Sequence, residues 1–182
     1  MGALERPRLR SFETRELLLL AFFATGLVLA RAALRWQLHI TGHSMFATAL
    51  LLVLARACVP RAGAATLAGA LAGAACAALG MGKGGALLVL KLALPGLAVD
   101  LGAALLPPVL VRPSLALLLG AAAGATDFLP VAIVETLAGL APDLVLWHAA
   151  ISAGAKAAFG AVGAAAGAAI AVRLRHHGLL QA

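Results

Sequence analysis

Residues 80–102 read GMGKGGALLVLKLALPGLAVDLG, and this stretch decides the fold class. It is apolar enough to cross a bilayer, yet Lys91, Pro95 and Asp100 lie inside its apolar run. A charged side chain at bilayer depth is costly, so such residues face a bundle interior or a water-filled cavity. The stretch therefore predicts a membrane helix whose polar side chains have defined partners.

The rest of the chain has the same apolar character. Of 182 residues, 63% are hydrophobic, and the mean hydropathy is +1.04. Soluble domains are nearer half apolar and do not gather apolar residues in runs of about 20. We expect a multi-pass protein of the inner (plasma) membrane, because a cleaved signal peptide would leave five further apolar runs unexplained. Cys58 and Cys76 fall within such runs and are predicted to be buried thiols, not a disulfide.

The apolar runs predict an all-α bundle of six transmembrane helices. A basic cytoplasmic leader (1–16) precedes the transmembrane domain (17–174), and a short cytoplasmic tail (175–182) follows it. Asp127 and Pro130 interrupt the fifth run, and the sixth is longer than a bilayer needs at 1.5 Å per residue. The six predicted spans are 17–34, 43–59, 63–79, 85–106, 114–138 and 142–174.

The basic residues predict the orientation of these spans. With the N-terminus inside, nine Lys and Arg residues lie at cytoplasmic ends, two lie at outer ends and three lie within spans. This excess predicts an N-in, C-in topology with an even number of spans. The net charge of +7 is thereby explained without nucleic acid, for which the chain has no recognition motif.

Small residues repeat along the predicted helices. Gly69 and Gly73 form a G-x-x-x-G pair, and so do Gly163 and Gly167. Because lipid tails are as apolar as leucine, membrane helices associate through close packing, which such residues permit. These pairs predict helix–helix contacts inside the bundle.

Most polar residues that are not cytoplasmic anchors fall in the outer half of the predicted bundle. Their position predicts an outward-facing cavity that binds a small molecule. In one alternative, the tryptophans form an interfacial belt, the other polar residues contact headgroups, and Lys91 pairs internally with Asp127 or Glu135. The candidate substrate-binding residues are Arg35, Trp36, His39, His43, Lys83, Lys91, Asp127, Glu135, Trp147 and His148.

No metal site, cofactor or catalytic motif is predicted. His39 and His43 are four residues apart, as two ligands on one helix face would be, but Gly42 lies between them. We interpret them as pocket or loop residues. The sequence GMGKGG lacks the G-K-[ST] ending of a phosphate-binding loop.

The run GKGGALLVLKLALPGLAVDLG, together with six short helices and an N-in topology, resembles the substrate-binding S component of an energy-coupling factor (ECF) transporter. The resemblance implies a vitamin or micronutrient importer that is not itself an enzyme and works with a T component and two ATPase subunits. S components carry a stripe of small residues on helix one for docking. Here Ala21, Ala24 and Thr25 approximate that stripe and are the predicted partner-binding residues.

The resemblance also gives the opening stretch an interpretation. Pro95 would kink the helix, because it removes a backbone hydrogen bond. Lys91, outside the kink, would contact an anionic or carbonyl-bearing ligand. Asp100, inside it, would cap or pair near the cytoplasmic end, with Arg112 or a partner protein as its counterpart.

Two other function classes stay open. The polar residues of a structural or assembly protein would serve only to pair its helices. A small intramembrane enzyme would use Asp127, Glu135 and His148 as acid–base groups. The identity and charge of a substrate are not predicted, because the outer half holds both cations and carboxylates.

Overall fold

The computed structural model describes residues 12–37, 42–81, 85–106, 110 and 112–178. Within them every regular element of four or more residues is an α-helix, which confirms the predicted all-α class. Seven helices are present: α1 (Thr14–Gln37), α2 (His43–Cys58), α3 (Ala64–Ala78), α4 (Leu87–Leu105), α5 (Pro113–Ala125), α6 (Phe128–Leu137) and α7 (Pro142–His176).

Local sequence explains several helix boundaries. Gly42 and Gly63 precede α2 and α3 with φ angles of 97° and 88°, a left-handed conformation that glycine adopts without steric cost. Pro113 and Pro142 lie in the first turns of α5 and α7, where a missing backbone N–H breaks no helical hydrogen bond. Helix α4 continues through Pro95 as one element.

Within the described residues, four segments are long and apolar enough to cross a membrane: Thr14–Leu34, Leu87–Leu105, Pro113–Leu137 and Pro142–His176. This supports the predicted multi-pass membrane protein. Helices α2 and α3 have only 16 and 15 residues, so each is about 23 Å long against a hydrocarbon core of about 30 Å. The count of six spans therefore stays a prediction.

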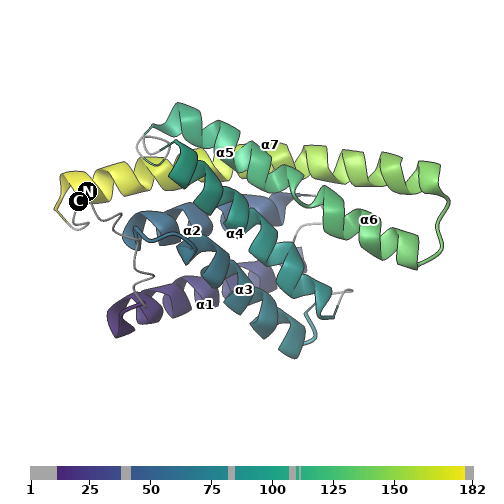
Figure 1. The fold of residues 1–182 in the computed structure, drawn as a ribbon, viewed down its shortest axis with the longest axis horizontal. Helices are drawn as coiled ribbons and strands as arrows, with labels where there is room; N and C mark the ends of the chain where they lie inside the picture. The colour runs from purple at the N-terminus through teal and green to yellow at the C-terminus, as the bar shows by residue number, and fades with distance from the viewer. Residues whose placement is uncertain (1–11, 38–41, 82–84, 107–109, 111, 179–182) are drawn as a thin grey trace, which may run out of the picture.

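Helices α2 and α3 nevertheless run between the same two ends of the bundle as α1 does (Figure 1). Arg61, in the α2–α3 turn, forms ion pairs with Glu16 at 2.8 Å and Glu13 at 3.6 Å. These contacts place the turn beside the start of α1. At the other end, Nε2 of His43 lies 3.2 Å from the carbonyl oxygen of Leu34, so α2 begins where α1 finishes.

The fifth predicted span is divided into α5 and α6. Thr126 and Asp127 form the turn between them, as the polar interruption predicts. Helix α5 packs extensively against α7, and α6 continues along α7 toward the far end of the bundle (Figure 1). The beginning of α1 and the end of α7 are both at the opposite end of the bundle.

Glycines allow the closest helix contacts. A Cβ atom added to Gly73 of α3 would lie 2.6 Å from the Cα atom of Val89 in α4. One added to Gly167 of α7 would lie 2.9 Å from the carbonyl oxygen of Leu50 in α2. Gly69 and Gly163 meet α4 and α2 in the same way, which confirms that both predicted G-x-x-x-G pairs mediate helix packing.

Large apolar side chains lie on the outside of the bundle as well as in its core. Leu20, Leu52 and Leu92 are fully buried. On the outside, Phe22 is 72% exposed and Leu118 is 70% exposed. Such a surface is unfavourable in water and favourable in lipid, in agreement with membrane-spanning helices.

Candidate functional site

One buried carboxylate organises the polar centre of the bundle. Asp127, in the α5–α6 turn, forms ion pairs with Lys91 of α4, at 3.6 Å, and with Lys156 of α7, which also donates a hydrogen bond to it. The Asp127 side chain is only 5% exposed. A charge at this depth requires partners, and these two lysines supply them from two different helices. We call these three residues the inner charge cluster.

Arg31 of α1 adds a further positive charge near this cluster. It lies close enough to interact electrostatically with both Asp127 and Lys91. Its Nε atom is buried and has no hydrogen-bond partner. Lys91 and Lys156 therefore share a single carboxylate, and Arg31, within electrostatic range, adds to the excess of positive charge.

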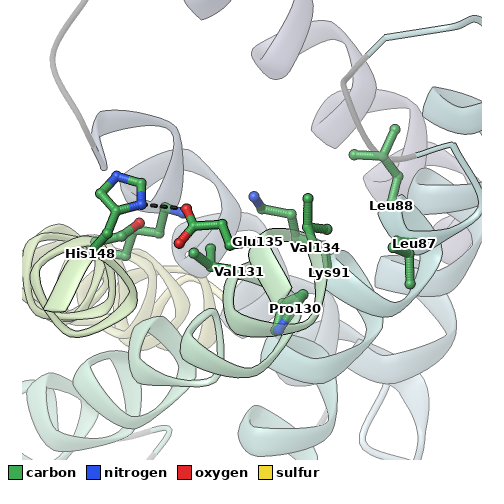
Figure 2. A pocket seen from close by; sticks show the side chains of 10 residues that line it. Leu87, Leu88, Lys91, Pro130, Val131, Val134, Glu135 and His148 are labelled. Atoms are coloured by element: carbon green, nitrogen blue, oxygen red, sulfur yellow. Dashed lines mark hydrogen bonds and ion pairs between the residues drawn. The ribbon is translucent and has the colours of Figure 1, made fainter. Parts of the chain in front are cut away.

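A second polar pair links α6 to α7. Oε1 of Glu135 contacts Nδ1 of His148 (Figure 2). The contact is a hydrogen bond when His148 is neutral and an ion pair when it is protonated. Its other carboxylate oxygen, Oε2, is buried and has no hydrogen-bond partner. A buried acceptor without a partner is unfavourable relative to its hydrated state.

The two polar groups are arranged as successive rungs between α6 and α7. Glu135 follows Asp127 by eight residues, and Lys156 follows His148 by eight residues along α7. Eight residues correspond to about 12 Å of helix. Because α6 and α7 are antiparallel neighbours, this shared spacing separates the Asp127–Lys156 rung from the Glu135–His148 rung by about that distance.

A cavity of about 320 Å³ lies along these rungs. It has an apolar wall from α4 and α6, and its polar groups come from α4, α6 and α7 (Figure 2). Its volume is at the small end of the range for ligand pockets. The lining residues are Leu87, Leu88, Lys91, Pro130, Val131, Val134, Glu135, His148, Ser152 and Lys156.

Of the predicted substrate-binding residues, the structure brings Lys91, Glu135 and His148 together in the cavity lining. Asp127 is not in the lining and instead pairs with two lysines that are. The predicted internal partner for Lys91 is therefore present. Because α4 begins at Leu87, Lys91 lies about one turn from the helix start.

The other predicted residues lie elsewhere. Trp147 is 70% exposed and outside the cavity lining, as the interfacial alternative predicts. His43 contacts the end of α1 and does not line the cavity. His39, Lys83 and the side chains of Arg35 and Trp36 lie outside the described residues.

Sequence reasoning missed Lys156 and Ser152 as site residues. Lys156 was counted only as a cation within a span, although an intramembrane lysine carries the same signal that singled out Lys91. His148, Ser152 and Lys156 are also spaced four residues apart. That spacing places them on one face of a helix, and it could have been found in the sequence.

Asp100 belongs to a separate cluster at the opposite end. It accepts hydrogen bonds from the backbone N–H groups of Ala65 (3.3 Å) and Thr66 (2.8 Å) and from the Thr66 hydroxyl (2.7 Å). This confirms the predicted capping role. The predicted pairing with Arg112 is wrong, because Nε of Arg56 lies 3.2 Å from Oδ1 of Asp100, whereas Arg112 is exposed at the start of α5.

The predicted partner-binding residues border a groove between α1 and α3. Ala21, Ala24 and Thr25 line it with Leu71 and Ala75. Ala21 and Thr25 are exposed, while Ala24 is only 7% exposed and belongs to the core. Across the described residues, no group of three or more His, Cys, Asp or Glu side chains is placed to hold a metal ion.

Comparisons of the chain with protein-family models, with curated proteins and with solved structures found no match. The site's own geometry must therefore carry any functional argument.

Proposed function

We propose that this protein is a membrane-embedded substrate-binding subunit of a vitamin or micronutrient importer. It captures a small molecule from the extracytoplasmic side and does not catalyse a reaction itself. A T component and two ATPase subunits supply ATP-driven uptake, as the resemblance to ECF S components implies. The membrane is the inner (plasma) membrane.

The cavity between α4, α6 and α7 is the observation that supports this proposal. It lies near the end of the bundle that the positive-inside rule predicts to face outward. Its mixture of an apolar wall and a few polar groups is typical of small-molecule sites. Lys91, Glu135 and His148 were candidate ligand contacts from the sequence, and all three line the cavity.

The ion pairs of Asp127 favour a second candidate, a structural protein without a ligand. Two lysines already neutralise this carboxylate, so polar residues that only hold helices together would look similar. An intramembrane enzyme would use the Glu135–His148 pair. The lining of one cavity by Lys91, Glu135 and Ser152 favours ligand capture over purely structural pairing.

A ligand screen separates these candidates. We expect a compound in a panel of vitamins, amino acids and nucleobases to raise the Tm of the purified protein. Ser152→Leu should lower the affinity for that compound at least about tenfold, because Ser152 lines the cavity and the larger leucine side chain would occupy part of the cavity. Gly154→Leu, two residues along α7 in open space, is the matched control and should respond as the wild type does.

If no compound stabilises the wild type, the result supports the second candidate, a structural protein without a ligand. An equal response from Ser152→Leu and the wild type would show that the compound binds elsewhere. Lys91→Met serves as a second cavity variant if Ser152→Leu fails to fold.

Partner docking has its own test. We expect Ala21→Trp to prevent co-purification with a T component and two ATPases, because a large side chain holds helices apart. Ala33→Trp, at another exposed alanine of α1, should leave the complex intact. Equal recovery of both variants would exclude the α1–α3 groove as the docking surface.

A further inference from the structure

The two polar groups along the cavity, the Asp127–Lys156 rung and the Glu135–His148 rung, differ in the interactions that they leave open to a ligand. At the inner charge cluster, Lys91 and Lys156 share the single carboxylate of Asp127, and Arg31 is nearby. The cluster therefore carries more positive than negative charge, and a second anionic group would reduce this imbalance. At the other rung, the Glu135 carboxylate lines the cavity and has acceptor capacity beyond its contact with His148.

The space between the rungs is apolar. Leu88, Pro130 and Val131 line this part of the cavity, and Ser152 is the polar exception between His148 and Lys156. A molecule that satisfied both rungs would need polar groups only at its two ends. The rungs are about 12 Å apart along the helices, and the side chains extend from them into the cavity, so the molecule must be shorter than that.

We propose, on the basis of the function proposed above, that the cavity takes a short unbranched carboxylate with a hydrogen-bond donor at its far end. The carboxylate binds the ammonium groups of Lys91 and Lys156, and an amino or hydroxyl group donates to the carboxylate of Glu135, which lines the cavity. An apolar chain between these groups contacts the Leu88 and Val131 wall. Charge balance supports this orientation, because the added anion offsets the excess of cations at the inner charge cluster.

The other charged groups near the site agree with this assignment. His148 contacts Oε1 of Glu135, and a carboxylate has further acceptor capacity for a donor from the ligand. A protonated His148 would neutralise Glu135 and leave the donor contact in place. The reverse orientation, with an amine at the lysines, would bring three or more cations together.

Three six-carbon probes test the proposal on the full chain. These are ε-aminocaproate with both end groups, caproate with the carboxylate alone, and hexylamine with the amine alone. Their affinities follow from the rise in Tm with probe concentration. We expect ε-aminocaproate to bind at least about tenfold more tightly than caproate, and hexylamine to give no shift.

Two variants assign the end groups. Lys91→Met should weaken the binding of ε-aminocaproate and of caproate at least about tenfold. Glu135→Gln should abolish the preference for ε-aminocaproate over caproate while leaving caproate binding unchanged. Asp143→Asn, at an exposed position in the first turn of α7, is the control and should bind all probes as the wild type does.

Each contrary outcome overturns the assignment. Tighter binding of hexylamine than of caproate would reverse the orientation, and unchanged caproate binding by Lys91→Met would remove the anion contact. If no probe shifts Tm but a compound from the vitamin panel does so in a manner sensitive to Ser152→Leu, the ligand class is wrong and the proposed function stands. If neither set shifts Tm, both fail.

Discussion

Replacing Asp100 with alanine provides a direct test of how the short helices are held. Its carboxylate, in α4, accepts two backbone hydrogen bonds and one hydroxyl hydrogen bond at the start of α3, and it pairs with Arg56 at the end of α2. One buried side chain therefore joins three helices. Helix α3 has no side-chain cap of its own and depends on this carboxylate.

The magnitude follows from what Asp100→Ala leaves behind. Arg56, whose side chain is 12% exposed, loses its counter-charge, and removing one partner of a buried ion pair costs about 3–5 kcal/mol. Loss of the cap on α3 contributes about 1 kcal/mol and overlaps with that figure. For a chain of this length the sum lowers Tm by about 6–20 °C. Asp100→Asn keeps one acceptor oxygen and should cost about 1–3 kcal/mol.

Thermal unfolding of the purified protein in detergent measures the effect. Asp143→Asn, an exposed carboxylate, is the control and should cost less than about 1 kcal/mol. Adding Arg56→Met to Asp100→Ala should restore part of the loss, because it removes the unpaired buried charge. If Asp100→Ala is as stable as the control, the carboxylate does not hold α2, α3 and α4 together.

The remaining predictions concern packing, topology and the inner charge cluster. Gly73→Ala should lower Tm because its Cβ atom would meet the α4 backbone, whereas Gly154→Ala, in open space, should leave Tm unchanged or raise it; equal effects would contradict the packing. In a background without native cysteines, Leu140→Cys should react with an impermeant thiol reagent in intact cells and Arg112→Cys should not; the opposite labelling would invert the topology. Asp127→Asn should destabilise the protein by about 3–5 kcal/mol, since it leaves two lysines without a counter-charge, and an unchanged Tm would remove that role.

The parity of the topology does not depend on whether α2 and α3 count as full spans. Four or six crossings both place the two termini on the same side. The close approach of Arg61 to Glu16 further shows that α2 returns to the level at which α1 begins. These observations agree with both ends of the bundle lying on the same side of the membrane, and the N-in, C-in assignment rests on the distribution of basic residues.

The amino-acid sequence was sufficient to predict the helical class, the approximate helix limits and the G-x-x-x-G contacts. These properties depend on local composition and on spacing along one helix, which a sequence displays directly. It also singled out Lys91, Asp127, Glu135 and His148, because a charged or polar side chain in an apolar run needs a partner wherever that partner lies.

Only the tertiary structure decided which partners those residues have. Asp127 meets Lys156 across 29 residues, and Asp100 meets the start of α3 across 34–35 residues. Such pairings depend on the relative rotation and depth of separate helices, which one helix's periodicity does not contain. For that reason the sequence left Arg112 or a partner protein as the counterpart of Asp100 and did not identify Lys156 as a site residue. In the packed bundle, Arg56 pairs with Asp100 and Lys156 lines the cavity.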